Sequence, residues 1–240
     1  MPKEPSSAEQ PNQLFDRSQV LDQLRPPAHA PEFSRVFAAR TCMMAGVGLT
    51  GVFLWYLVRF WVYGKAVVLT SAPLTIPAGF LIAGMAVATL IGAALASWAA
   101  GPISERIEEK NIPVARVVAG ACLLYAAGLA LAWGLGVWST GTARENGMLL
   151  FALISGFAFG VYDSLGLELV MDSLPDPRRA GHDLGIYALA NSAGLALAAI
   201  IGALLVNAFE HSFGYYLLFP SAIVMVLLAG IVTLTTKSAE

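Results

Sequence analysis

Residues Leu195–Val206 read LALAAIIGALLV, an unbroken run of apolar and small side chains. Strands of a membrane barrel alternate polar and apolar residues, and this run does not alternate. Lipid offers no partners to backbone N–H and C=O groups, so the helix is the remaining structure that can cross a bilayer. The run therefore predicts a membrane-spanning helix, which extends over Leu184–Val206.

The rest of the chain has the same character. Of its 240 residues, 57% are hydrophobic and only 12% are charged, whereas a soluble globular protein carries about 25% charged residues. This balance excludes a soluble domain and a disordered chain, and it predicts an all-α membrane protein. The formal net charge is −2, and without a dense cluster of Lys and Arg the chain has no attraction for nucleic acid.

The residue types that enzymes and metal sites need are scarce. Cys42 and Cys122 lie inside apolar runs, where buried thiols are more common than disulfides or metal ligands. His29, His182 and His211 lie outside these runs, and none shares a helix face with further ligands at metal-binding spacing. We therefore expect no enzyme activity, no cofactor and no metal site.

Six segments are long enough to cross a hydrocarbon core about 30 Å thick, at a rise of about 1.5 Å per residue. The predicted spans are Thr41–Tyr63, Pro77–Ala100, Pro113–Trp138, Met148–Met171, Leu184–Val206 and Tyr215–Leu234. Residues 35–236 thus form a six-helix transmembrane domain. Residues 1–34 are a polar cytoplasmic tail that either carries a short surface helix or is mobile, and residues 237–240 are a second cytoplasmic tail.

The basic residues predict the orientation. With six spans, most of the fourteen Lys and Arg residues lie on the side of the amino terminus. The eleven on that side are Lys3, Arg17, Arg25, Arg35, Arg40, Arg106, Lys110, Arg116, Arg178, Arg179 and Lys237. The three on the opposite side are Arg59, Lys65 and Arg144. Because basic residues gather on the cytoplasmic side, both termini are expected in the cytoplasm and the protein in the cytoplasmic (plasma) membrane.

Small residues recur every four positions in the second and fifth spans. These residues are Gly84, Ala88, Gly92, Ala96 and Ala100, followed by Ala190, Gly194, Ala198 and Gly202. Such faces let helix backbones approach closely, so they predict helix packing within the bundle, or close contacts that a rocking motion requires.

The fourth span, Met148–Met171, holds two acids, Asp163 and Glu168. A charge at membrane depth costs at least about 2.5 kcal/mol, and such residues are functional candidates. A stripe of small and polar residues runs down the same helix. Its members are Gly156, Gly160, Ser164, Glu168 and Asp172. This stripe must face neighbouring helices or a water-filled cavity rather than lipid.

Helix geometry predicts different surroundings for the two acids. Asp163 lies about 12 Å above the inner boundary and Glu168 about 4–5 Å above it. Arg40 and Arg116 are at a depth that suits an ion pair with Glu168. Asp163 is expected to have no basic partner at its level. It would then bind a proton reversibly, or simply form a hydrogen bond to a neighbouring hydroxyl.

Residues 101–110, GPISERIEEK, resemble a loop signature of the major facilitator superfamily, Gly-x-Leu-[Ser/Ala]-Asp-Arg-x-Gly-Arg-Arg/Lys. The matching positions are Gly101, Ile103, Ser104, Glu105, Arg106 and Lys110, with conservative replacements at the second and fourth. Glu108 and Glu109 stand where the family has Gly-Arg. The resemblance implies a cytoplasmic loop that gates transport through charge pairs, with Gly101, Ser104, Glu105, Arg106 and Lys110 as its residues.

Two further stretches resemble the sugar-type members of that superfamily. Residues 160–185 contain GVY, LPD and DLG and are similar to their tenth and eleventh helices, and PEF at 31–33 is similar to the start of their seventh helix. The usual acid of the family corresponds to Gly166, whereas this chain has its acids at 163 and 168. The resemblance implies the carboxy-terminal six-helix half of a twelve-helix bundle.

In that family the first, second, fourth and fifth helices of each half line the central cavity. Asp163 and Glu168 lie in the fourth helix, and as acids at membrane depth they are the candidates for proton or substrate coupling. The resemblance makes Tyr162, Ser164, Asn191 and Ser192 candidates for lining the cavity.

Two functions are expected from these features. The first is a half-size secondary transporter that moves a sugar or another small polar solute by proton-coupled alternating access. Its partner in the bilayer would be a second six-helix half or a second copy of the chain. The second is a non-transporting six-helix membrane subunit, or a truncated remnant of a transporter.

Overall fold

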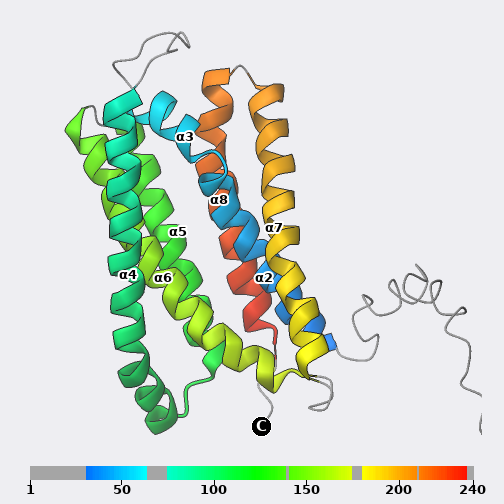
Figure 1. The fold of residues 1–240 in the computed structure, drawn as a ribbon. Helices are drawn as coiled ribbons and strands as arrows, with labels where there is room; N and C mark the ends of the chain where they lie inside the picture. The colour runs from blue at the N-terminus through cyan, green and yellow to red at the C-terminus, as the bar shows by residue number, and fades with distance from the viewer. Residues whose placement is uncertain (1–30, 64–74, 139–140, 175–179, 210, 237–240) are drawn as a thin grey trace, which may run out of the picture.

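The computed structural model describes residues 31–63, 75–138, 141–174, 180–209 and 211–236, and these residues form helices and no strand. Figure 1 shows their arrangement as a bundle. The elements are α2 (Pro31–Gly51), α3 (Leu54–Leu57), the π-helix η1 (Val58–Val62), α4 (Thr75–Lys110), α5 (Val114–Trp138), α6 (Thr142–Asp172), α7 (Ala180–Ala208) and α8 (His211–Leu234). The polar tail predicted before residue 31, with its candidate surface helix, lies outside the described residues.

Five helices, α4 to α8, are long and apolar enough to cross a membrane. They coincide with the second to sixth predicted spans, and most of them extend beyond the apolar residues on which those predictions rest. This extension corrects one expectation, because residues 101–110 are not a loop but the last turns of α4. Pro102 lies inside this helix, where the missing N–H removes one backbone hydrogen bond.

The end of α4 has a recognisable cap. Asn111 adopts a positive φ of 50°, and the N–H of Ile112 donates to the carbonyl of Ile107 at 3.0 Å. This is the geometry of a Schellman motif, in which Asn is one of the few residues that tolerates the left-handed conformation. Pro113 follows and cannot continue the helix. The helix therefore ends at its capping residues, about ten residues beyond Ala100, the predicted end of the span.

The first predicted span, Thr41–Tyr63, is wrong in its limits and in its continuity. α2 begins at Pro31, where a proline is suited to the first helical position, so the predicted domain boundary at residue 35 falls inside a helix. The α-helix ends at Gly51, and Phe53 takes φ −98° and ψ 11° before α3 begins. The ring of Phe53 packs directly on Gly202 of α7, and a Cβ atom at position 202 would collide with this ring.

The helices form a pattern of contacts that repeats. α2 packs on α7 and α8, α6 packs on α4 and α5, and α5 packs on α8. Exchanging the first three helices (α2, α4, α5) for the last three (α6, α7, α8) leaves these pairings unchanged, whereas a smaller contact of α7 with α8 has no equivalent between α4 and α5. α2 and α6 run in opposite directions along the bundle in Figure 1. The contacts are therefore those of two three-helix units with inverted orientation.

Glycines allow the closest of these contacts. A Cβ atom on Gly156 of α6 would meet the backbone of Thr89 in α4, and one on Gly92 would meet the backbone of α6. At the corresponding interface of α2 and α7, a Cβ on Gly194 would lie 2.7 Å from the carbonyl oxygen of Thr41. The predicted packing role of the small residues is confirmed at these positions.

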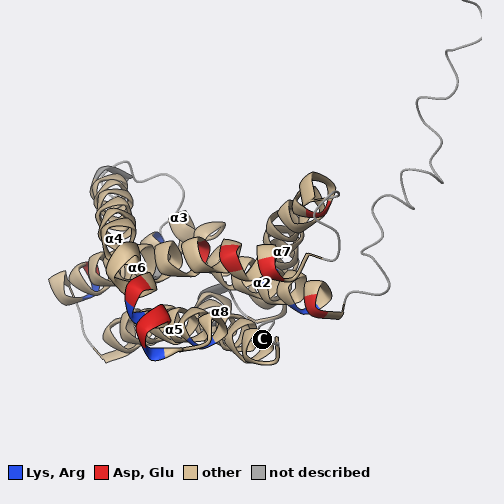
Figure 2. Cartoon of the chain, turned by 90° about the horizontal axis from the view of Figure 1, so that it is seen from below, with Lys and Arg blue, Asp and Glu red and all other residues tan. Residues whose placement is uncertain are grey.

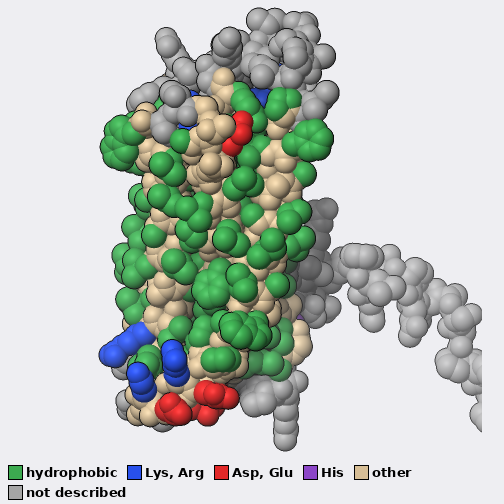
Figure 3. All heavy atoms as spheres, turned by 90° about the vertical axis from the view of Figure 1, so that its left-hand side faces the viewer, with side chains coloured by type: hydrophobic (Ala, Val, Ile, Leu, Met, Phe, Trp, Pro, Cys, Tyr) green, Lys and Arg blue, Asp and Glu red, His purple; other side chains and the backbone are tan. Residues whose placement is uncertain are grey.

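Seen along the bundle, α6 and α2 lie in the middle, α4 and α7 stand well apart on either side, and α5 and α8 cover one face (Figure 2). The other face of α2 and α6, between α4 and α7, is here called the open face. Figure 3 shows that the side of the molecule on which α4 lies is apolar over most of its height, with charges near both ends. Large apolar side chains of α4 are exposed there, among them Phe80, Leu90 and Trp98. Five apolar helices with such a surface indicate a multi-pass membrane protein.

Candidate functional site

An ion pair joins α2 to α6 at the open face. Nη1 of Arg40 lies 2.7 Å from Oδ1 of Asp163, and the Arg40 side chain is 9% exposed whereas that of Asp163 is 55% exposed. Nε of Arg40 donates a hydrogen bond of 2.7 Å to Oδ1 of Asn191 in α7. One buried guanidinium thus connects three helices, and its carboxylate partner lies on the outer side of the pair.

This pair corrects two expectations. Asp163 has a basic partner, and Arg40 pairs with it rather than with Glu168. The reason lies in the start of α2. Arg40 is nine residues after Pro31, and Asp163 is nine residues before the end of α6 at Asp172. Both helix ends lie at the lower end of the bundle in Figure 1, so each residue is about 13–14 Å from that end.

Three aromatic rings surround the guanidinium. The Cζ atom of Arg40 lies 5.6 Å from the ring centroids of Phe159 and Tyr162 and 5.7 Å from that of Tyr187. Cation–π attraction and the two polar partners together offset the cost of removing this charge from water. The guanidinium is therefore held from several directions, of which Asp163 is only one.

Sequence reasoning assigned Arg40 to Glu168 instead of Asp163, and it missed Phe159 and Tyr187 as members of the site. A signal for the two rings exists, because Phe159 precedes Asp163 by four residues and Tyr187 precedes Asn191 by four. Side chains at that spacing lie on one helix face. Each helix thus presents an aromatic ring and a polar group in consecutive turns, which is what a buried guanidinium can use. No such pattern identifies Arg40 itself.

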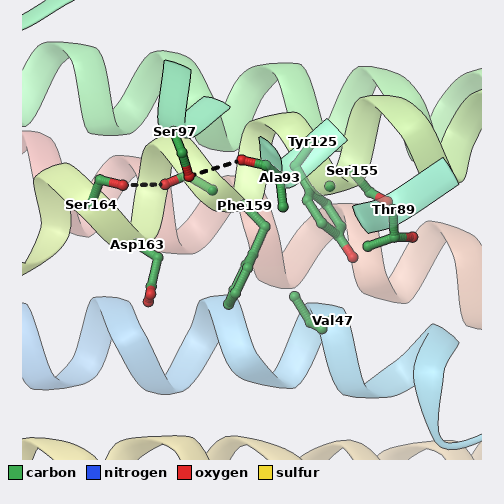
Figure 4. Close-up of a pocket in the computed structure, with 11 residues that line it drawn as sticks. Val47, Thr89, Ala93, Ser97, Tyr125, Ser155, Phe159, Asp163 and Ser164 are labelled. Atoms are coloured by element: carbon green, nitrogen blue, oxygen red, sulfur yellow. Dashed lines mark hydrogen bonds between the residues drawn. The ribbon is translucent and has the colours of Figure 1, made fainter. Parts of the chain in front are cut away.

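A cavity of about 400 Å³ adjoins Asp163. It lies mainly between α4 and α6, and Figure 4 shows the side chains around it. The lining residues are Val47, Thr89, Ala93, Ser97, Tyr125, Ser155, Gly156, Phe159, Gly160, Asp163 and Ser164. Its volume lies within the range of small-molecule sites, about 300–1,000 Å³. The cavity is therefore large enough for a small organic solute.

The hydroxyl groups of this cavity share one arrangement. Ser164 donates to the carbonyl of Gly160 at 2.8 Å, Ser97 to that of Ala93 at 3.1 Å, and Thr89 to that of Met85 at 2.9 Å. A hydroxyl that donates to its own helix retains its oxygen as an acceptor. The polar groups of the cavity are therefore mostly acceptors in this structure, with the carboxylate of Asp163 at one end, and the rest of the lining is largely apolar.

The remaining predicted site residues are distributed unequally. Tyr162 is buried against Arg40, and Asn191 is half-buried and bonded to it, whereas Ser192 is exposed on α7. None of these three lines the cavity, and Ser164 does. Glu168 is exposed on α6, and within the described part of the chain it has no ion pair with Arg40 or Arg116. The structure therefore assembles Asp163, Tyr162 and Asn191 around Arg40 and leaves Glu168 apart.

The predicted gating residues lie on the final turns of α4. Gly101, Glu105, Arg106 and Lys110 are exposed and Ser104 is half-buried. No salt bridge joins these residues to another helix in the described ranges. Across the same ranges, no group of three or more His, Cys, Asp or Glu residues is close enough to hold a metal ion.

Comparison with known proteins adds no identification. No protein-family model, no curated protein and no solved structure matches this chain. What the site does must therefore be argued from Arg40, Asp163 and the cavity beside them.

Proposed function

We propose that this chain is one half of a secondary transporter that moves a small polar solute through the bilayer by alternating access. The observation that carries the proposal is the Arg40–Asp163 pair, whose carboxylate is 55% exposed and lies nine residues before the end of the apolar helix α6. A charged pair at this depth is too costly to face lipid. A water-filled path between this chain and a partner would hydrate it.

The repeated contact pattern supports the same proposal. Inverted three-helix repeats are the construction unit of many secondary transporters, and their substrate sites lie near the membrane midplane, at the interface of repeats. In this chain α2 and α6 are the corresponding first helices of the two units, and the Arg40–Asp163 pair lies between them. Under the proposal α2 with α3 and η1 forms a sixth, interrupted span, and both termini are cytoplasmic.

The open face implies a partner. α4 and α7 are separated, and α2 and α6 expose polar groups between them, so a second six-helix body is needed to enclose the path. This body is a separately encoded half or a second copy of the chain. The sequence resemblance to sugar-type major facilitator proteins implies a sugar or similar solute, with the proton carried by Asp163 and Glu168 as a second candidate.

Transport by reconstituted protein tests this proposal. The purified chain, together with any membrane subunit that copurifies with it, is placed in proteoliposomes with an inward proton gradient. Uptake of radiolabelled glucose and gluconate is compared with that of protein-free liposomes. We expect uptake of at least one solute, loss of most of it in Asp163→Asn, and normal uptake in Asp172→Asn, an exposed acid on the same helix.

The alternative function is a membrane subunit that transports nothing. It is favoured if uptake stays at the protein-free level while the reconstituted protein is folded and correctly inserted. Uptake that is the same in Asp163→Asn and in the unmodified protein would reject the assigned role of Asp163, whatever the solute.

A further inference from the structure

We propose that Arg40 is the anchor for a carboxylate group of the solute, and that Asp163 occupies this anchor while the solute is absent. The inference rests on the proposed function and names its substrate class as small organic monocarboxylates, hydroxy acids included. Binding of the solute then requires that Asp163 leave Arg40.

Asp163 can leave without releasing Arg40. The guanidinium keeps its hydrogen bond to Asn191 and its three ring contacts, all from side chains other than Asp163. Asp163 lies on the outer side of the pair, 55% exposed against 9% for Arg40. The carboxylate is therefore the accessible member of the pair, and the guanidinium behind it is the fixed one.

The groups around Arg40 are suited to an anion. Because Oδ1 of Asn191 accepts from Arg40, the amide nitrogen of Asn191 carries two further donors beside the guanidinium. A guanidinium binds a carboxylate through parallel hydrogen bonds, and the fixed fork loses little freedom in doing so. A departing Asp163 thus leaves a donor set for which a second carboxylate is the matching ligand.

Charge balance decides between an anion and a cation. Arg40 cannot lose its proton in a protein, and an unpaired buried guanidinium is strongly destabilising. A cationic solute that took Asp163 would leave Arg40 in that condition. An anionic solute keeps it paired, provided that Asp163 takes up one proton. One proton on Asp163 and one carboxylate on Arg40 leave the net charge of the site unchanged.

Asp163 is the carboxyl group that contacts Arg40 among the described residues. The groups that face it are Arg40 from α2, Tyr162 from its own helix and Tyr187 from α7, with Cys122 of α5 near Tyr162. The cavity-lining residues of α4 are Thr89, Ala93 and Ser97, and none of them has a titratable side chain. We therefore place the proton that accompanies the anion on the Asp163 carboxylate.

The adjoining cavity accepts the body of the solute. Its hydroxyl oxygens are acceptors in this structure, so they match hydroxyl groups on a ligand, and its volume of about 400 Å³ admits a molecule of six carbons. A hydroxy acid places its carboxylate on Arg40 and its hydroxyls toward α4 and α6. Gluconate and glucose are a matched pair of probes, because they share one carbon skeleton and differ in the carboxylate.

Thermal unfolding of the purified full-length chain in detergent tests the inference without transport. Gluconate, lactate and glucose are titrated at about pH 6 and about pH 7. We expect gluconate or lactate, and not glucose, to raise the Tm. The apparent Kd of the carboxylate should rise about tenfold per pH unit, because one proton binds with each anion.

Variants separate the roles of the two residues. In Asp163→Asn the competing carboxylate is gone, so we expect tighter binding of the carboxylate at about pH 7 and loss of most of the pH dependence. Asp172→Asn should bind like the unmodified protein. Arg40→Lys keeps the charge and loses the fork, and it should weaken carboxylate binding. If Arg40→Lys does not fold, the comparison of Asp163→Asn with Asp172→Asn still tests the inference.

Three results would overturn the inference. They are a Tm shift by glucose equal to that by gluconate, no shift by either carboxylate, and an unchanged pH dependence in Asp163→Asn. Failure of the transport proposal is distinguishable from these. Carboxylate binding without uptake would support the role of Arg40 and reject the transporter proposal. Uptake of glucose without carboxylate binding would support the transporter proposal and reject the role of Arg40.

Discussion

At the scale of single residues, Arg40 determines the chemistry of the site. The Arg40 side chain is 9% exposed. Its charge is compensated by the Asp163 carboxylate, the Asn191 amide and three aromatic rings. A buried charge of this kind is tolerable only while its partners remain. Removing the carboxylate of Asp163 should therefore cost more stability than removing that of Asp172, another exposed acid on α6.

Replacing Asp163 with leucine should destabilise the protein by about 3–5 kcal/mol, because Arg40 is then buried without a counter-charge. Asp172→Leu, an equal change at an exposed acid on the same helix, should alter stability by no more than about 0.5 kcal/mol. Thermal unfolding of both purified variants measures the difference. Equal Tm values would show that Asp163 does not neutralise Arg40.

At the scale of helices, the interface of α4 and α6 depends on glycines, which have no side chain to hold the helices apart. Gly156 and Gly92 bring the two backbones together, and this approach places Ser97, Thr89 and Asp163 around one cavity. Without a hydrophobic effect between helices in lipid, dispersion contacts at such short distances provide much of the packing energy. The shape of the cavity thus follows from glycines that do not themselves bind anything.

A methyl group at Gly156 should separate the helices. The new Cβ would meet the backbone of Thr89, which cannot rotate away, so Gly156→Ala should destabilise the bundle by about 1–3 kcal/mol. Gly120→Ala is the matched control, because no atom outside its own helix turn lies within 4 Å of that Cβ. The control should be neutral or slightly stabilising. Unfolding in denaturing detergent compares the two, and an equal response contradicts the close contact.

At the scale of the whole molecule, the two ends of the described chain meet. Nη1 of Arg35, near the start of α2, donates to the carbonyl of Thr235, beyond the end of α8, at 3.0 Å. The chain therefore returns to the end of the bundle from which it started. The proposed six spans have this consequence, and the last turns of α4 lie at the same end of the bundle (Figure 1).

Cysteine labelling tests this topology. Cys42 and Cys122 are first replaced by alanine, and single cysteines are then introduced by Glu109→Cys, at the end of α4, and Asn146→Cys, near the start of α6. Both positions are exposed. A membrane-impermeant maleimide should label the second in intact cells and the first only in inverted vesicles. Labelling of both from one side would contradict the six-span arrangement.

Apolar runs predicted the helices well because helix formation in lipid depends on local properties. The runs beginning near residues 77, 113, 148, 184 and 215 each appear as one continuous helix. Their ends were less predictable, since a helix continues into water as long as its residues favour it. Residues 101–110 belong to α4 for that reason, until Asn111 provides a cap. At the break after Gly51, Phe53 packs against Gly202 of α7, and such a contact between helices is not a local property of the sequence.

The sequence by itself determined that this is a membrane protein of long apolar helices, and that Asp163 is the more deeply placed acid of its predicted span. Those features follow from the hydrophobicity and spacing of neighbouring residues. Only the tertiary structure decided that Arg40 pairs with Asp163, that Asn191 and three rings hold it, and that a cavity adjoins the pair. These contacts join residues more than a hundred positions apart. They depend on which helices are neighbours and how far each is shifted along the next, and packing between helices sets both.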